Sequence, residues 1–216
     1  MKGAGRRLLV VEDEPLMASL LAEVLVAQGF LVQTAADTLQ ARAAVDSFDP
    51  DAALLDISLG EGPSGLDLAH VLHRKYPHIA LLFLTKHSDP RTAGLADKDL
   101  PAGCGFLRKD RVRDTDYLLE SLEAVLTERP DRVRDDQDPD QPLAALTGHQ
   151  LEILRLMAQG YTNDYIARFK GASQSSVERW VMQIFRTLEI DTRGDVNPRV
   201  EAVRRFIASS SLPERA

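Results

Sequence analysis

Short apolar runs alternate with segments of helical periodicity over the first 128 residues. The apolar runs cover residues 6–11, 31–35, 52–57, 79–84 and 105–108. Apolar side chains recur at helical spacing over residues 15–28, 38–48, 65–76 and 115–128. This alternation predicts a doubly wound α/β fold, in which helices cover both faces of a five-stranded parallel sheet. Residues 88–102 fit the pattern poorly because Pro and Asp interrupt any helix there, and we expect mobility.

The pattern changes at residue 129. Residues 129–142 contain three prolines and almost no apolar side chain, so we interpret them as an extended acidic linker. Beyond it every long pattern is helical: Thr147, Thr162 and Ser173 are suited to cap three helices, and Asn197-Pro198 to open a fourth. The predicted organisation is therefore an α/β domain at 1–128, a linker at 129–142 and an all-α four-helix domain at 143–216.

Composition and charge narrow the class of protein. A hydrophobic fraction of 44% supports packed cores, and the single cysteine, Cys104, excludes an intramolecular disulfide. No apolar run approaches the roughly 18 residues of a membrane span, so we expect a cytoplasmic protein without a membrane partner. The net charge of −7 is uneven: residues 1–130 hold 14 basic and 20 acidic side chains, and residues 143–216 hold 10 and 8. An acidic body thus precedes a mildly basic one.

Charged and polar side chains stand at the ends of the predicted strands. Glu12 and Asp13 follow the first strand, Asp56 the third, Thr85 the fourth and Lys109 the fifth. Open parallel sheets bind ligands at this edge. Converging carboxylates repel each other unless a divalent cation or the lysine compensates, and oxygen ligands favour Mg²⁺. Such a cluster suits phosphoryl transfer, in which the cation and the lysine neutralise the phosphoryl group while Asp56 attacks it.

The first 130 residues resemble a two-component receiver domain, a flavodoxin-like fold. The motifs that carry the resemblance are Leu9-Val-Val-Glu-Asp-Glu-Pro15, Leu54-Leu-Asp-Ile57, Leu82-Phe-Leu-Thr85 and Gly105-Phe-Leu-Arg-Lys109. The resemblance implies that Asp56 accepts a phosphoryl group from a sensor histidine kinase and that Lys109 pairs with the phosphate. It further implies that Mg²⁺ is held by Glu12, Asp13, Asp56 and the backbone carbonyl of Ser58.

The resemblance also assigns a coupled switch to Thr85 and Phe106, although Phe106 has an equally good interpretation as a core residue.

Three positions depart from the receiver pattern. Lys86 stands where receivers usually have a small residue, which predicts slower dephosphorylation or a different choice of donor. Gly60 and Asp110 each replace a common proline. None of these changes removes a required group, but a degenerate receiver that acts without phosphorylation stays open as an alternative.

A second functional surface is predicted on the helix expected at residues 173–188. At 100° per residue, Val177, Val181 and Ile184 share one side with Phe185 and Leu188, and polar residues occupy the other. With the short helix at 162–169 it forms a helix-turn-helix, which places its second helix in the DNA major groove. The predicted DNA-contacting residues are Lys170, Gln174, Ser175, Ser176, Glu178, Arg179, Met182 and Arg186. A charged face of this kind can also be simply solvated.

The C-terminal residues are similar to the LuxR-type helix-turn-helix through Leu146-Thr-Gly-His-Gln-Leu-Glu-Ile-Leu154, Gly160-Tyr-Thr-Asn-Asp-Tyr-Ile-Ala167 and Ser176-Val-Glu-Arg-Trp-Val181. Together the two matches resemble a NarL/FixJ response regulator. That implies a transcription factor controlled by phosphorylation, bound to double-stranded promoter DNA as a homodimer. Glu178 departs from the lysine common there, and Trp180 is interpreted first as a core residue. On the last helix, Val200, Val203 and Phe206 or Ile207 either form a dimer surface or pack within their own domain.

Two other classes of protein share part of this pattern. A phosphatase or dehalogenase with an aspartyl nucleophile needs a second acid two residues after it, where this chain has Ser58, so we do not expect an enzyme. A pure interaction module would use the receiver to dock a partner and the C-terminal helices to dimerise. If the chain is a response regulator, we expect the unphosphorylated receiver to cover either the helix at 173–188 or the last helix.

Overall fold

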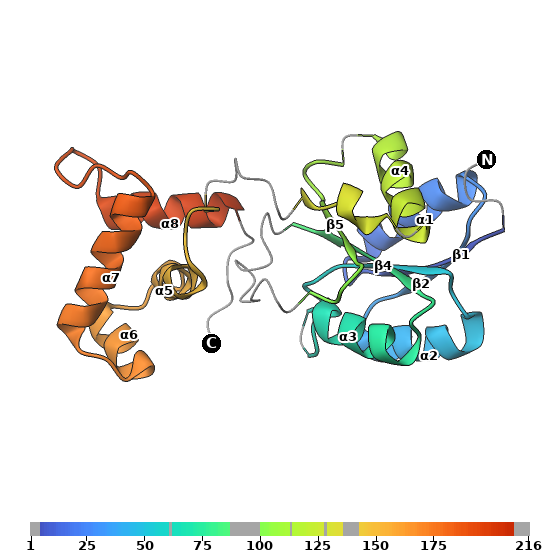
Figure 1. Cartoon of the computed structure of the whole chain (residues 1–216), viewed down its shortest axis with the longest axis horizontal. Coiled ribbons are helices and arrows are strands. Elements are labelled where there is room, and N and C mark those ends of the chain that lie inside the picture. Colours follow the sequence, from blue (N-terminus) through green and yellow to red (C-terminus); the bar gives the residue numbers. More distant parts are fainter. Residues whose placement is uncertain are drawn as a thin grey trace. The chain divides into compact units, whose positions relative to one another are not determined.

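The computed structural model describes residues 5–60, 62–86, 100–112, 114–127, 129–135 and 143–209. The chain divides into two compact units, which are taken separately (Figure 1). The first unit contains the described residues from 5 to 135, and the second contains residues 143–209.

The first unit is built on a parallel sheet of five strands in the order β2-β1-β3-β4-β5. Helices α1 and α4 lie on one face of it and α2 and α3 on the other (Figure 1). This strand order is the flavodoxin-like form of the doubly wound fold, so the predicted fold class is confirmed. The strands are β1 (Arg7–Val11), β2 (Leu31–Ala35), β3 (Ala52–Leu55), β4 (Ala80–Thr85) and β5 (Gly105–Arg108), and the helices are α1 (Pro15–Ala27), α2 (Thr38–Phe48), α3 (Gly65–Lys75) and α4 (Thr115–Leu126).

Burial explains why the strands read as nearly continuous apolar runs. All four residues of β3 and five of the six in β4 are buried, because helices cover both faces of the central strands. The helices begin where polar side chains satisfy their first free N–H groups: Asp37, Ser64 and Asp114 each accept a hydrogen bond from the backbone three residues on. The strand ends are thereby held at fixed positions along one edge of the sheet.

The predicted linker boundary at residue 129 is wrong, because residues 129–135 pack on the first unit. Pro130–Arg132 form a short 3-10 helix, η3, and the Val133 carbonyl accepts a 2.7 Å hydrogen bond from the N–H of Phe106 on β5. Asp135 is buried and accepts hydrogen bonds from the Arg108 N–H (3.0 Å) and the Tyr117 hydroxyl (3.2 Å). The segment therefore covers the free edge of β5. Residues 136–142, and most of the 88–102 segment, lie outside the described residues.

The second unit contains the four predicted helices, α5 (Gly148–Ala158), α6 (Asn163–Lys170), α7 (Gln174–Thr187) and α8 (Pro198–Ser209). The side chains of Thr147, Thr162 and Ser173 accept the expected capping hydrogen bonds, and Asn197 Oδ1 accepts one from the Arg199 N–H. The helices enclose a separate apolar core. Across the described residues, no helix has the length and apolar character that crossing a membrane requires.

Helix α8 belongs largely to this core. Phe206 is fully buried and Val203 packs against the same cluster, whereas Val200 is 54% exposed. The Arg199 guanidinium ties the start of α8 to the start of α6 through the Tyr161 carbonyl (2.5 Å) and Asn163 Oδ1 (2.8 Å). Of the two interpretations of α8, packing within its own domain is therefore correct for Phe206, which is not available to a partner.

Candidate functional site

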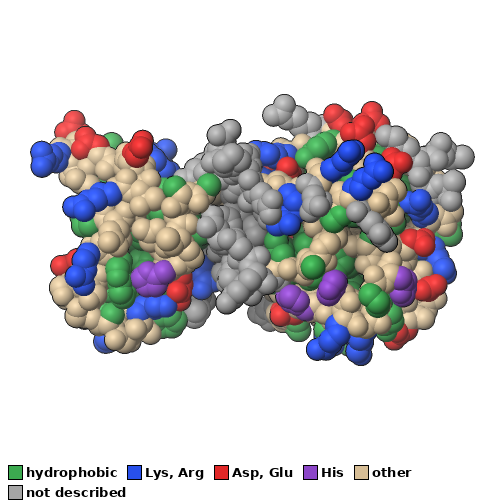
Figure 2. Space-filling view, in the orientation of Figure 1, with side chains coloured by type: hydrophobic (Ala, Val, Ile, Leu, Met, Phe, Trp, Pro, Cys, Tyr) green, Lys and Arg blue, Asp and Glu red, His purple; other side chains and the backbone are tan. Residues whose placement is uncertain are grey.

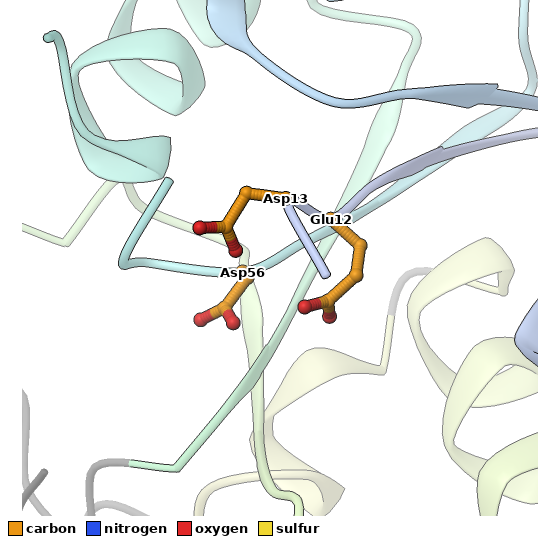
Figure 3. Close-up of side chains that lie close together, drawn as sticks. All are labelled: Glu12, Asp13 and Asp56. Atoms are coloured by element: carbon orange, nitrogen blue, oxygen red, sulfur yellow. The ribbon is translucent and has the colours of Figure 1, made fainter. Parts of the chain in front are cut away.

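Three carboxyl groups converge at the carboxyl ends of the strands. Glu12 and Asp13 follow β1, and Asp56 follows β3, the neighbouring strand. Each residue offers an oxygen that lies within 4.8 Å of the others, and Figure 3 shows the carboxyl groups directed into a common space. The residues come together because β1 and β3 pair with Val11 opposite Leu55, so the two strands end at the same level of the sheet. The predicted convergence of these acids is confirmed.

Lys109 closes the cluster from the other side. Its ammonium lies 2.7 Å from Glu12 Oε2 and 2.6 Å from Asp56 Oδ2; Glu12 and Asp56 are buried, and the Lys109 side chain is 9% exposed. Burial raises the pKa of the Glu12 carboxyl above its ordinary value, although the hydrogen bond from Lys109 opposes that shift. Burial alone would lower the pKa of the Lys109 ammonium, but the charges and hydrogen bonds of Asp56 and Glu12 outweigh it and raise that pKa. Lys109 is therefore firmly cationic beside the acids.

One oxygen of the cluster fits a metal ion. Glu12 Oε1 is a buried carboxylate oxygen with no hydrogen-bond partner among the described residues. A buried acceptor of this kind is costly unless something satisfies it. With Asp13 and Asp56 it forms a donor set made only of oxygen, which suits Mg²⁺. The residues present therefore fit the predicted divalent cation.

Gly65 is a site residue that the sequence analysis missed. It is the first residue of α3, and a Cβ added there would lie 1.8 Å from the carbonyl oxygen of Asp56. Its N–H donates a 2.9 Å hydrogen bond to the Ile57 carbonyl. The helix thus starts directly against the loop that carries Asp56. The sequence held only a weak signal for this, a glycine immediately after the capping Ser64.

The other residues predicted around Asp56 are also at the site. The Ser58 N–H donates to Asp56 Oδ1 (3.2 Å), while the metal-binding role of its carbonyl stays a prediction. Gly60 has a φ of +61°, which explains why a proline, with its φ fixed near −65°, is absent there. Thr85 and Phe106 are fully buried, and the Phe106 ring packs 6.3 Å from that of Phe83. Phe106 is thus a core residue, and the switch roles of Thr85 and Phe106 stay predictions.

Lys86, the long cation that departs from the receiver pattern, does not enter the acid cluster. Its ammonium forms an ion pair with the carboxylate of Glu14, and both side chains are about half exposed. The hydrogen bond from Lys86, with its charge, lowers the pKa of the Glu14 carboxyl. The lysine is thereby held beside the cluster by a partner that sequence reasoning did not identify.

In the second unit, α6 and α7 form the predicted helix-turn-helix, joined at Gly171 in the left-handed conformation. Val177, Val181, Ile184 and Phe185 are buried on one side of α7. The opposite side is exposed at Gln174, Ser175, Glu178, Arg179, Met182 and Arg186, whereas Ser176 is half-buried. The predicted division of this helix into a packed and a free face is confirmed.

Two residues near this face have partners inside the unit. Lys170 lies 2.8 Å from Glu152 Oε2 on α5, so its ammonium must leave that carboxylate before it can reach a phosphate. Trp180 packs against the core and meets His149 edge-on, with ring centroids 4.6 Å apart. Acidic and basic side chains are interspersed on the face of this unit seen in Figure 2. On that face the basic side chains do not form one continuous patch.

Comparison with known proteins finds response regulators that are similar to this chain over both units. The model of the response regulator receiver domain matches residues 8–109. The nitrate/nitrite response regulator NarP of Escherichia coli K12 is 29% identical over 199 residues, covering 87% of this chain and 90% of that protein. The DNA-binding transcriptional activator DevR/DosR of Mycobacterium tuberculosis H37Rv is 26% identical over 200 residues, with the same two coverages, 87% and 90%.

A solved structure extends the likeness in fold to nearly the whole chain. RcsB from Salmonella enterica serovar Typhimurium, bound to promoter DNA with a BeF₃⁻ phosphomimetic, gives a TM-score of 0.56 and covers 94% of this chain and 98% of that one. Its sequence identity is 18%, so this likeness concerns the fold alone.

Proposed function

The chain belongs to the NarL/FixJ family of two-component response regulators, and from that premise we propose that it transmits a signal from a sensor histidine kinase to promoter DNA. The observation that carries the proposal is the buried cluster at the strand ends, where Asp56 lies 2.6 Å from the Lys109 ammonium. Beside it, the carboxylate oxygen Oε1 of Glu12 has no hydrogen-bond partner among the described residues. A nucleophilic carboxylate with adjacent positive charge suits phosphoryl transfer. Regulators of this kind act in the cytoplasm, where we place the chain.

In the proposed transfer, a carboxylate oxygen of Asp56 attacks the phosphorus of a phosphohistidine on the kinase. An O–P bond forms as the N–P bond breaks, and the imidazole leaves with the bonding electrons. Glu12, Asp13, Asp56 and the Ser58 carbonyl would hold Mg²⁺, which when bound supplies charge neutralisation for the phosphoryl oxygens. Lys109 already contacts the accepting carboxylate, so it can pair with the phosphoryl oxygens without leaving the site.

We propose that phosphorylation of Asp56 shifts β5 and that this shift alters the second unit. Phe106 and Lys109 lie on β5 or directly after it, and the Lys109 N–H donates to the Thr85 carbonyl at 2.8 Å. The edge of β5 also binds Val133 and Asp135, in the segment that leads toward the second unit. A shift of β5 when Lys109 changes partner would therefore act directly on that segment. The active form would be a homodimer, since one helix-turn-helix makes a small interface and two copies read a two-fold site.

The DNA-binding half of the proposal predicts the effect of Arg179→Ala. Arg179 is exposed on the free face of α7, where its guanidinium touches only Ser176 Oγ at 3.3 Å among the contacts described. If it contacts guanine, its removal should weaken binding to the best promoter site by about 1–3 kcal/mol and relax preference at one base pair. Titration of labelled promoter fragments at fixed salt measures both effects.

Arg193→Ala is the matched control for that experiment. It removes the same charge from an exposed position in the segment between α7 and α8, outside the α7 helix itself. We expect it to leave base preference unchanged. Equal losses for Arg179→Ala and Arg193→Ala would show that charge alone is responsible, and unchanged binding in both would show that α7 does not lie in the groove.

A further inference from the structure

The ion pair between Glu14 and Lys86 joins residues that follow the two strands on either side of β3, the strand that leads into Asp56. Glu14 follows β1 and Lys86 follows β4, and β3 lies between those two strands in the sheet. Neighbouring strands are about 4.8 Å apart, so the ends of β1 and β4 are separated by roughly two strand spacings. An ion pair between them must cross the end of β3, where Asp56 begins its loop. We call the pair the Glu14–Lys86 bridge.

The bridge lies on the solvent side of the acid cluster. The side chains of Glu14 and Lys86 are 51% and 50% exposed, whereas that of Asp56 is 7% exposed. The bridge is thus accessible to solvent at the same edge of the sheet at which Asp56 is buried. Lys86, neutralised by Glu14, is also held away from the Asp56 carboxylate, which is paired with Lys109 instead.

Each end of the bridge lies at or next to a residue whose backbone carbonyl accepts a hydrogen bond. The Glu14 carbonyl accepts the Ala18 N–H at 3.0 Å in the first turn of α1, and Thr85, just before Lys86, is held by the Lys109 N–H at 2.8 Å. Glu14 makes no capping hydrogen bond with its side chain, so changing it should leave α1 intact.

We propose that the Glu14–Lys86 bridge determines how long the phosphoryl group stays on Asp56. This inference rests on the proposed phosphoacceptor role of Asp56. In hydrolysis, the oxygen of a water molecule attacks the phosphorus from the side opposite the Asp56 oxygen. The O–P bond to Asp56 breaks, and inorganic phosphate, the free carboxylate and a proton are released. The bridge occupies the outer side of the site, so it hinders that water and lengthens the life of the phosphoryl group.

The bridge should act as a unit, because neither charge reaches across β3 alone. An exposed ion pair is weak and opens often, so the expected effects are a few-fold in rate, about threefold to fivefold. Glu14→Ala and Lys86→Ala should shorten the half-life of the phosphoryl group by similar factors. The double variant should be no faster than the faster single variant, since the second change finds the bridge already broken.

The test uses the full chain, phosphorylated with acetyl phosphate in Mg²⁺, and follows loss of the label after the donor is removed. Lys75→Ala, which removes an exposed lysine at the end of α3, is the control and should decay like the parent chain. Additive effects of the two single variants, or an unchanged half-life in Glu14→Ala, would overturn the bridge as the determinant. Failure of the parent chain to become labelled would instead contradict the proposed function, so the two failures are distinct.

Discussion

Asp56→Asn is expected to abolish stable phosphoryl labelling of the chain. An amide is not a carboxylate nucleophile, and position 56 would no longer offer the carboxylate oxygen that Lys109 contacts at 2.6 Å. The labelling is measured by intact mass after incubation with acetyl phosphate and Mg²⁺. The parent chain should gain one phosphoryl group that is lost on treatment with base or hydroxylamine.

Asp116→Asn is the control for this substitution. It makes the same chemical change at an exposed acid in the first turn of α4, away from the strand ends, and should label like the parent chain. If Asp56→Asn gained as much phosphoryl as the parent, the acceptor would lie elsewhere and the proposed transfer would be wrong.

Gly65→Ala is expected to lower the free energy of unfolding of the first unit by about 3 kcal/mol or more. A methyl group 1.8 Å from the Asp56 carbonyl oxygen cannot be accommodated by a side-chain rotation, because the obstructing atom is backbone. The start of α3 must move away from the Asp56 loop, or the loop must move instead. Unfolding by denaturant measures the loss, and any folded fraction should also label slowly because Asp56 is displaced.

Gly148→Ala offers a matched control, since Gly148 is likewise the first residue of a helix and follows a capping-box residue, Thr147. No atom lies within 4 Å of the Cβ that the change adds. We expect a small gain in stability, about 0.5 to 1 kcal/mol, because alanine reduces the entropy of the unfolded chain. If Gly65→Ala were equally well tolerated, the close approach of α3 to Asp56 would not exist in solution.

The sequence predicted most of the fold because its signals are local. Alternating apolar runs define the strands, and Thr147, Thr162 and Ser173 mark helix starts through hydrogen bonds within three residues. The convergence of Glu12, Asp13 and Asp56 was also predictable, because a parallel sheet brings the ends of its strands to one edge whatever the details of packing.

The features that the sequence did not reveal depend on contacts between residues far apart in the chain. Lys86 and Glu14 are separated by 72 positions, and nothing in the local pattern links them. Residues 129–135 have the composition of a linker, yet Asp135 is buried because an unpaired N–H at the edge of β5 and the Tyr117 hydroxyl both donate to it. The role of Gly65 likewise depends on the close approach of the start of α3 to the Asp56 backbone, which exists only in the folded chain.

The central claim, that phosphorylation of Asp56 controls DNA binding, is tested most directly by one affinity comparison. A promoter fragment selected by the full chain from genomic DNA is titrated with the parent chain and with Asp56→Asn, each before and after treatment with acetyl phosphate and Mg²⁺. The account predicts that treatment tightens binding by the parent chain about tenfold, within the usual range of coupling between two sites, and leaves Asp56→Asn unchanged. Equal affinity of the treated and untreated parent chain would contradict the claim and leave the chain as a DNA-binding protein that acts without phosphorylation.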